Sequence, residues 1–292
     1  MSGARPRGRP QAPETPISRW SETGWEQRDD QLVAEEPLQL LLGGAPLSIV
    51  MRTPGHDVEL ALGLLWAERV ITDRGQIEQV RISAETGESE PLLPLTPDLI
   101  ESNQVDVTVR SGGRPVQRSL LSTSACGVCG ATTVESLALD FEPLPLGDVM
   151  DPALLGLLPE RLRAQQRVFD KTGGLHAAGL FGFDGSLKVL REDVGRHNAV
   201  DKVVGRALIG GRLPLAQHIL LVSGRGGYEI VQKAVAAGIP IVAAVGAPSS
   251  LAVATARRFG QTLVGFLRDG RFNVYSGEER LVRGVQPGRQ PL

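Results

Sequence analysis

The 292-residue sequence contains only two cysteines, Cys126 and Cys129, which cannot form the disulfide framework of a small secreted domain. Aromatic residues make up 4% of the chain, and no segment approaches the run of about 20 apolar residues that a membrane-spanning helix needs. The net charge of −2 gives no sign of nucleic-acid binding. The N-terminal residues lack the apolar segment of a secretory signal. These absences favour a cytoplasmic protein that binds neither membranes nor nucleic acid.

The remaining composition is that of a globular protein, with 41% hydrophobic and 22% charged residues. The length allows one large domain or two of ordinary size. Changes in composition along the chain predict five parts: a disordered tail (1–29), a small α+β N-terminal domain (30–115), a segment with the cysteine pair, a helix and a linker (116–150), an α/β domain (151–280) and a C-terminal tail (281–292).

Alternating hydrophobicity predicts the elements of the N-terminal domain. Two apolar runs, 37–42 and 45–52, flank Gly43 and Gly44 and predict a hairpin. A helix is expected over 56–70, and strands are expected over 79–83 and 105–110. The polar, proline-containing stretch between these two strands is expected to be a loop.

The second half of the chain alternates short apolar runs with longer amphipathic segments. Helices are expected over 152–170, 194–209, 228–237 and 248–258, and strands over 174–183, 187–191, 217–222, 239–245, 262–267 and 271–275. Buried strands that alternate with helices predict a three-layer αβα sandwich with a mainly parallel core. The fold class is therefore α/β.

The cysteine pair lies in a polar, glycine-flanked segment, CGVCG, ahead of a predicted helix. A helix N-terminus favours the thiolate form of a cysteine, and Gly127 and Gly130 leave room beside the sulfur. A structural zinc site needs about four ligands and this pair supplies two. A thioredoxin-like dithiol or two inert buried cysteines are further alternatives. We favour a loop that carries a nucleophilic thiolate at Cys126.

Two turns follow neighbouring strands of the predicted sheet. The first, Ser223–Gly227, is rich in glycine, so its backbone amides can face an anion, and Arg225 can bind phosphate in a bidentate manner. The second, 247–250, carries hydroxyl groups that can also serve as a helix cap. Both turns are at the carboxyl ends of strands, where open α/β sheets bind ligands.

The densest polar stretch runs from Arg191 to Lys202. On a helix, His197 and Asp201 share one side, and so do Asn198 and Lys202. We expect several of these groups to lie near the ligand edge of the sheet, although an exposed salt-bridged helix is an alternative. His176 is either a core histidine or part of the same site.

Several segments together resemble the FdhD/NarQ family, the formate dehydrogenase accessory sulfurtransferases. They are CGVCG at 126–130, TGGLHAAGL at 172–180, EDVGRHNAVDKVVG at 192–205, the long segment 223–253 that begins SGRGGYE, and LVGFLRDGR at 263–271. The segments 35–44 and 54–71 are also similar, so the resemblance covers roughly residues 30–280. It implies a cytidine-deaminase-like C-terminal fold and a homodimer.

The resemblance also implies a reaction. Members of this family accept sulfur as a persulfide from a cysteine desulfurase and pass it to the molybdenum or tungsten bis(molybdopterin guanine dinucleotide) cofactor that formate dehydrogenase needs. The persulfide falls on Cys126, and we expect Cys129 to relay or resolve it. The family's cofactor segment falls on Phe266, Leu267, Arg268, Asp269, Gly270 and Arg271, and we expect Ser223, Gly224, Arg225 and His197 to contribute.

The zinc signature of deaminases is missing from the corresponding turns, which read EDVGRHN and SGRGGYE. We therefore expect no metal site and no deamination, with the molybdenum cofactor as bound substrate. Two other functions stay open. A chaperone that only shields the cofactor would not need either cysteine, and a dithiol oxidoreductase would need both equally.

Overall fold

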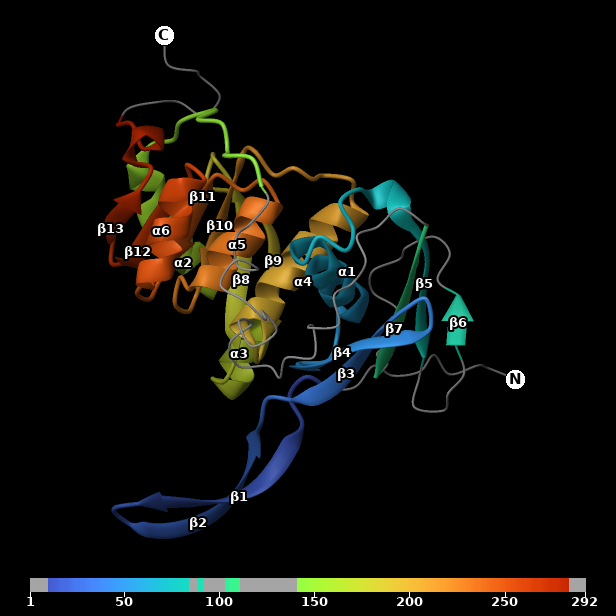
Figure 1. The fold of residues 1–292 in the computed structure, drawn as a ribbon. Coiled ribbons are helices and arrows are strands. Elements are labelled where there is room, and N and C mark those ends of the chain that lie inside the picture. Colours follow the sequence, from blue (N-terminus) through green and yellow to red (C-terminus); the bar gives the residue numbers. More distant parts are fainter. Residues whose placement is uncertain (1–9, 84–88, 92–102, 111–140, 284–292) are drawn as a thin grey trace.

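The computed structural model describes residues 10–83, 89–91, 103–110 and 141–283. In this part of the chain the strands form a six-stranded sheet, a five-stranded sheet and a separate two-stranded hairpin (Figure 1). The two larger sheets correspond to the expected αβα sandwich and the smaller α+β domain, so the predicted α/β fold class is confirmed. None of the described helices is long and apolar enough to cross a membrane.

The five-stranded sheet has the order β4-β3-β7-β5-β6. Its strands are β3 (Glu36–Leu42), β4 (Ala45–Arg52), β5 (Ile77–Ser83), β6 (Ser89–Pro91) and β7 (Gln104–Val109), and the helix α1 (Asp57–Ala67) and the 3-10 turn η1 (Arg74–Gln76) lie between β4 and β5. Alternating residues of β3 and β7, including Leu38, Leu40 and Val105, are buried in a core that α1 completes. The hairpin over 37–52 is confirmed. The expected loop after β5 contains the short strand β6, which pairs with β5.

The six-stranded sheet has the order β13-β12-β11-β10-β8-β9. Its strands are β8 (His176–Gly182), β9 (Leu187–Asp193), β10 (His218–Val222), β11 (Ile241–Ala244), β12 (Thr262–Arg268) and β13 (Arg271–Ser276). Only β10, β11 and β12 run parallel, and the other pairings are antiparallel. The core of the sheet is thus parallel, as expected. Tight turns at Asp184 and Asp269 join β8 to β9 and β12 to β13 directly, which makes these flanking pairs antiparallel.

Helices cover both faces of this sheet. They are α2 (Pro152–Arg163), α3 (Arg167–Thr172), α4 (Arg196–Ile209), α5 (Tyr228–Ala236) and α6 (Ser250–Arg258). Leu220 and Val222 of β10 pack toward α4, α5 and α6, whereas Ile219 and Leu221 pack toward α2. Successive side chains of a strand point to opposite faces of the sheet, so β10 contributes apolar side chains to the cores on both faces.

Several helix boundaries differ from the prediction; α1, for example, ends at Ala67 and not at residue 70. The helix expected over 152–170 breaks into α2 and α3, because the first amides of α3, those of Val168 and Phe169, bind the Glu192 carboxylate at 3.1 and 2.9 Å. Such a tertiary contact leaves no mark in the periodicity of the sequence. Helix α6 begins after Pro248, and the hydroxyl of Ser249 caps it by accepting from the Ala252 amide at 3.2 Å.

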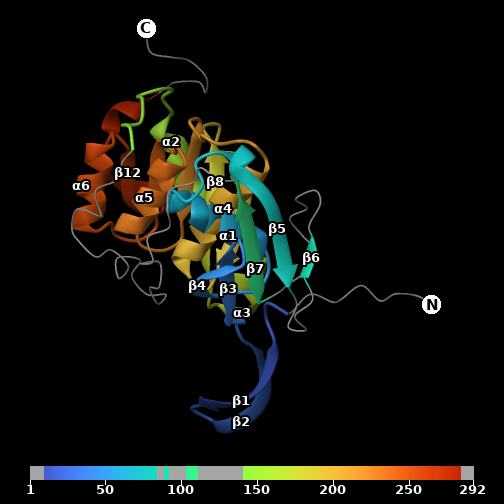
Figure 2. The ribbon, with the colours of Figure 1, turned by 45° about the vertical axis from the view of Figure 1, so that its right-hand side comes forward.

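The expected N-terminal tail is wrong for residues 14–29. Strands β1 (Glu14–Ser21) and β2 (Gly24–Gln31) form an antiparallel hairpin that projects from the rest of the molecule (Figures 1 and 2). At the other end, the expected tail from 281 also begins too early, because Leu281 pairs with Met150 and the Val282 amide donates to the Met150 carbonyl at 2.9 Å. The other domain boundaries stay predictions.

The two larger sheets are joined by the close crossing of α1 and α4. A Cβ atom on Gly63 of α1 would lie 1.9 Å from the Asp201 carbonyl oxygen, and one on Gly205 of α4 would lie 1.8 Å from the Glu59 carbonyl oxygen. The two backbones are therefore in direct contact at two points, which only glycine permits.

Candidate functional site

The carboxyl ends of β10, β11 and β12 meet at one edge of the six-stranded sheet. The Gly246 amide donates to the Gly224 carbonyl at 3.0 Å, and the Phe266 amide donates to the Gly246 carbonyl at 3.1 Å. A Cβ atom on Gly246 would come 3.0 Å from the Gly224 carbonyl oxygen. Glycine thus lets the turns after β10 and β11 pack directly against the bulged end of β12. The structure brings together the two turns that the sequence placed at this edge.

Ser223 anchors the first of these turns to β8. Its amide donates to the Ala177 carbonyl at 2.9 Å, and its hydroxyl oxygen accepts from the Ala177 amide at 2.9 Å. The hydroxyl proton remains available to a ligand. Arg225, two residues on, is exposed. Ser223 therefore has a structural role in addition to its expected role in binding, while the guanidinium of Arg225 is directed to solvent at the edge.

The residues expected to hold the cofactor line an open groove of about 720 Å³ at the turn between β12 and β13. The register shifts between Gly265 and Arg268, and Phe266 adopts a positive φ of 54°. As a result Phe266 is 40% exposed while Leu267 is fully buried. Phe266, Arg268, Gly270 and Arg271 line the groove, and Phe272 and Asn273 extend it.

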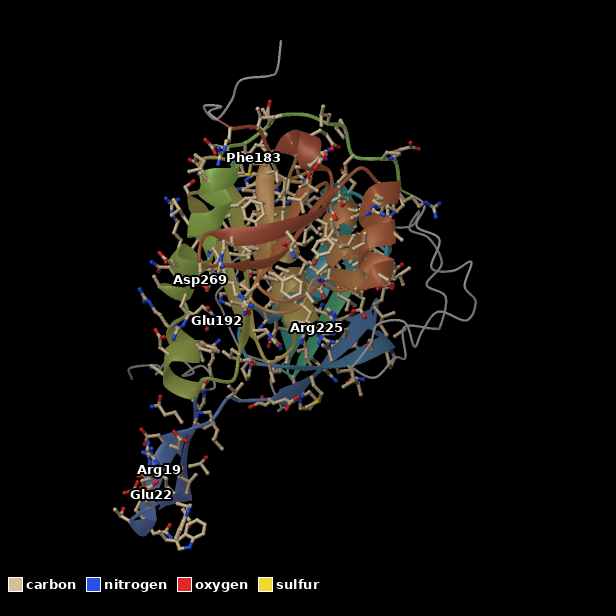
Figure 3. The ribbon with its side chains drawn as sticks, turned by 90° about the vertical axis from the view of Figure 1, so that its left-hand side faces the viewer. Arg19, Glu22, Phe183, Glu192, Arg225 and Asp269 are labelled. Carbon is tan, nitrogen blue, oxygen red and sulfur yellow. The ribbon has the colours of Figure 1, made fainter. Side chains whose placement is uncertain are left out.

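The groove is both aromatic and basic. Within the described part of the chain, neither Arg268 nor Arg271 forms an ion pair, so both guanidinium groups are available to an anion. Arg225 and Asp269 lie on the same side of the molecule, which Figure 3 views directly. Of the predicted cofactor residues, Leu267 alone is turned into the core, where its side chain packs beneath the groove.

His197 contacts Glu229 across the first turns of α4 and α5. Its Nδ1 lies 2.9 Å from the Glu229 carboxylate, and the two side chains are 18% and 13% exposed. Burial raises the pKa of Glu229, but the hydrogen bond and charge of His197, together with Lys233 and Arg196, outweigh burial and hold that pKa below its ordinary value. Glu229 therefore fixes the orientation of the His197 ring, and sequence reasoning did not single it out.

Two further residues lie beside the turn at Gly224. The His176 ring would be 3.3 Å from a Cβ atom at Gly224, and the Arg196 side chain would be 3.8 Å away. Burial, followed by the charge of Arg196, lowers the pKa of His176, which is therefore neutral at pH 7. The Arg196 Nε atom is buried and has no hydrogen-bond partner in the described part of the chain. Arg196 precedes His197 in the sequence, and this adjacency is the only feature of the sequence that indicates Arg196 as a residue of the site.

Most of the polar stretch 191–202 lies elsewhere. Asp193 and Lys202 are fully buried and 2.7 Å apart, and Asn198 donates to Asp193 at 2.9 Å. Asp201 binds Lys233 at 2.7 Å, also in the interior. The expectation that several of these groups reach the ligand edge is therefore wrong for these four residues. Asp193, Asn198 and Lys202 bind the backbone at Met51 and Thr53, whereas Asp201 joins α4 to α5.

The cysteine pair lies outside the described residues. Cys126 and Cys129 fall within the segment 111–140. Their assignment as sulfur carrier and relay stays a prediction.

A family comparison identifies the chain. The sequence model of the FdhD/NarQ family matches residues 33–282. The chain belongs to the FdhD/NarQ family. The sulfur carrier protein FdhD of Corynebacterium efficiens is 49% identical over 254 residues, covering 86% of this chain and 91% of that protein. The sulfur carrier protein FdhD of Streptomyces coelicolor is 49% identical over 271 residues, covering 90% and 93%. That of Mycobacterium tuberculosis is 44% identical over 260 residues, covering 87% and 92%.

A solved structure agrees with this assignment. The crystal structure of a protein described as a formate dehydrogenase accessory protein, from Desulfotalea psychrophila, superimposes with a TM-score of 0.72 at 25% identity. The match covers 94% of this chain and 100% of that one. The whole architecture, including both large sheets, is therefore that of a family member.

Proposed function

We propose that this protein carries sulfur for a formate dehydrogenase. The main support is that nearly the whole chain is similar to proteins named sulfur carrier protein FdhD, at 44–49% identity. The paired cysteines in a glycine-flanked segment supply the group that such a function needs. The cytoplasm, where thiols stay reduced, is the compartment in which we expect it to work.

In the proposed reaction the thiolate of Cys126 attacks the terminal sulfur of a persulfide on a cysteine desulfurase. A new sulfur–sulfur bond forms on Cys126, the sulfur–sulfur bond of the donor breaks, and the donor cysteine leaves as a thiolate. The sulfur–sulfur bond of the Cys126 persulfide then breaks and Cys126 is recovered as a thiolate, while the outer sulfur would become the sulfur ligand of the metal. The two electrons that reduce this sulfur to the sulfide level come from a thiol reductant of the cell. Cys129 is the group that relays or resolves the persulfide.

The substrate in this proposal is the molybdenum or tungsten bis(molybdopterin guanine dinucleotide) cofactor, and the groove beside Phe266 suits its nucleotide part. An exposed phenyl ring offers a stacking surface for a base. Arg268 and Arg271 line the same groove and offer bidentate donors to phosphate oxygens. Arg225 adds a third guanidinium on that side of the molecule (Figure 3). The residues therefore match the stacking and charge of a guanine nucleotide.

His197 has a separate part in the proposal. Because its Nδ1 faces Glu229, the ring presents Nε2 as the atom that can hydrogen-bond a substrate. The neighbouring Ser223 hydroxyl and the backbone of Gly224 complete this part of the site. A homodimer, a cysteine desulfurase as donor and a formate dehydrogenase as recipient are the partners that the proposal includes.

Activation of formate dehydrogenase in cells that lack their own accessory protein tests the function. We expect Cys126→Ala to abolish formate dehydrogenase activity while the variant still accumulates as a folded protein. Cys129→Ala is the matched control, and we expect it to retain part of the activity. Full activity with both cysteines replaced would favour a chaperone that only binds the cofactor. Equal loss in both single variants, with reduction of disulfide substrates, would favour a dithiol oxidoreductase.

A further inference from the structure

A second polar cluster lies at the ligand edge of the six-stranded sheet, around the turn at Gly224. It consists of Ser223 and Gly224 after β10, His176 at the start of β8, and Arg196 and His197 at the start of α4, and it is here called the Gly224 cluster. Strand β8 runs antiparallel to β10, so the first residue of β8 lies beside the end of β10. The fold thus brings together residues from three separate parts of the chain.

The side chains of this cluster converge on the backbone of Gly224. A Cβ atom at this position would lie 3.3 Å from His176 Nδ1 and 3.8 Å from Arg196 Cδ. Burial, then the charges of Arg196 and His197, lower the pKa of His176, so the three side chains lie close together. A side chain at position 224 would occupy the space between His176 and Arg196, and glycine leaves this space free.

Arg196 brings positive charge to the cluster without a counter-ion. Within the described part of the chain it forms no ion pair, and its Nε atom is buried without a hydrogen-bond acceptor. The carboxylates of this region already have partners: Glu229 with His197, Asp193 with Lys202, and Asp201 with Lys233. A buried donor without an acceptor destabilises the folded chain, and a bound ion is one of the usual reasons why such a donor is kept.

The helices that begin at the cluster add further donors. The N-cap residues of α4 and α5 are Gly195 and Gly227, so neither helix has a side-chain cap. By contrast, Asp151 caps α2 and Ser249 caps α6. The first amides of a helix without a cap are free to bind an anion, and they reinforce the charge of Arg196.

We propose that the Gly224 cluster is a second phosphate-binding site of this chain, and that it binds a phosphate group of the same cofactor whose nucleotide lies in the groove at 266–271. Which molecule supplies the phosphate rests on the proposed function. The guanidinium of Arg196 supplies the charge and a bidentate donor, and the Ser223 hydroxyl supplies a further donor. The neutral His176 ring can donate to a phosphate oxygen as well.

The two sites are too far apart to bind the same phosphate group. The groove follows β12, and Gly224 follows β10, which lies two strands away in the sheet. Neighbouring strands are about 4.8 Å apart, so the ends of β10 and β12 are roughly 10 Å apart. The proposed cofactor has two nucleotide halves, each with its own phosphates, so one chain can bind one half at each site.

Pyrophosphate is a suitable probe of the second site, because it has no base to stack on Phe266. By isothermal titration calorimetry on the full chain, we expect the unmodified protein to bind two pyrophosphate ions and Arg268→Ala/Arg271→Ala to bind one. Adding Arg196→Gln to this groove variant should weaken the remaining binding by about tenfold or more, since it removes a charge-assisted contact.

The matched control is Arg167→Gln in the same groove variant. Arg167 is the first residue of α3, as Arg196 is of α4, but the amides that follow Arg167 are already bound by the Glu192 carboxylate. We expect this substitution to leave pyrophosphate binding unchanged.

Two glycines of the same turn test the geometry. Neither Gly224 nor Gly227 has a positive φ, so alanine suits the backbone at both positions. Gly224→Ala places a methyl group between His176 and Arg196 and should weaken pyrophosphate binding, whereas a Cβ atom at Gly227 meets nothing within 4 Å. Gly227→Ala should therefore bind normally, and equal binding by the two variants would contradict this position for the phosphate.

Urea unfolding separates a binding role of Arg196 from a structural one. Without ligand, Arg196→Gln should be at least as stable as the unmodified chain, because its Nε atom has no acceptor to lose. Pyrophosphate should raise the unfolding midpoint of the groove variant, and this increase should be lost when Arg196→Gln is added.

The stoichiometry of binding decides between the possible results. Two GDP molecules per unmodified chain support a cofactor phosphate at the Gly224 cluster, whereas one GDP with two pyrophosphate ions would overturn this source. A groove variant that binds no pyrophosphate, or that binds it equally with and without Arg196, would overturn the second site itself. Failure of the nucleotide site of the proposed function gives a different result, namely that Arg268→Ala/Arg271→Ala binds as much GDP as the unmodified chain.

Discussion

Lys202 Nζ lies 2.7 Å from the Asp193 carboxylate, and neither side chain has any exposed surface. The ammonium also donates to the Thr53 carbonyl at 2.9 Å, and Asp193 accepts from the amide of Gly195 at 2.8 Å. The pair thus links α4 and β9 of the six-stranded sheet to the segment that follows β4 of the other. A buried charge that keeps its partner and its hydrogen bonds is tolerated, whereas one that loses its partner is strongly unfavourable.

We expect Lys202→Met to lower the free energy of unfolding by about 3–5 kcal/mol, since it leaves Asp193 buried without its counter-ion. Thermal or urea unfolding measures this. Lys188→Met is the control, because Lys188 and Asp184 form an exposed pair at 3.9 Å, and its removal should change stability by no more than about 1 kcal/mol. Equal effects of the two substitutions would contradict this account of the interior pair.

The crossing of α1 and α4 gives a second prediction. Gly205→Ala would place a methyl group 1.8 Å from the Glu59 carbonyl, which forces the helices apart and should cost about 1–3 kcal/mol or more. Gly210→Ala, at the end of the same helix, meets nothing closer than 3.4 Å and should be close to neutral. Urea unfolding measures the change in the free energy of unfolding for both variants. If Gly205→Ala is as stable as the unmodified chain, the direct backbone contact is not present in solution.

His56 gives a prediction for the pH dependence of stability. Burial, then the charges of Arg191, Lys202 and Arg206, lower the pKa of His56 from 6.5 to about 3. Between these values the unfolded chain binds a proton that the folded chain does not, so stability is full above pH 6.5 and falls as the pH decreases toward 3. The side chain is 33% exposed, so screening reduces the loss at pH 5 to on the order of 1 kcal/mol.

His56→Asn removes this titration and suits the backbone, because φ is 61° and asparagine tolerates the left-handed region. The free energy of unfolding, measured by urea at pH 7 and pH 5, should fall less in the variant than in the unmodified chain. The same decrease in both proteins would show that His56 is not the group responsible.

Much of the fold could be predicted from the sequence because it depends on local patterns. The glycine pair at Gly43 indicates the hairpin of β3 and β4, and the spacing of apolar residues indicates the strand β10 and the helix α5. The hairpin of β1 and β2 could not be predicted, because its strands bury almost nothing and Trp20 and Trp25 face solvent. The break before α3 depends on Glu192, a residue that follows it by more than 20 positions and is brought close only by the fold.

Part of the candidate site could also be predicted from the sequence, and part could not. The turns at 223–227 and 247–250 could be placed at one edge, because parallel strands end on the same side of a sheet. The segment 266–271 was assigned only through the resemblance to the family. The roles of Lys202 and Asn198 could not be predicted, because a polar residue on a helix looks the same whether it faces a ligand or the other sheet. Glu229 and Arg196 were missed because their partners, His197 and the Gly224 turn, are neighbours only in space.

Binding of GDP, as a probe of the nucleotide part of the cofactor, tests the groove. We expect Arg268→Ala and Arg271→Ala each to weaken binding by about tenfold, since each removes a charge-assisted contact with phosphate worth roughly 1.5 kcal/mol or more. Isothermal titration calorimetry measures the affinities. Arg258→Ala, on α6 with its guanidinium stacked on Phe259, is the control and should bind normally. Unchanged affinity in both groove variants would place the nucleotide elsewhere.

Mass spectrometry of the protein after incubation with a cysteine desulfurase and free cysteine tests the central claim most directly. The account predicts the gain of one sulfur atom on the peptide that contains Cys126, its removal by a thiol reductant, and its absence from Cys126→Ala. In Cys129→Ala the sulfur should still appear on residue 126. If sulfur accumulates on Cys129 alone, or on neither cysteine while the desulfurase turns over, Cys126 is not the sulfur carrier.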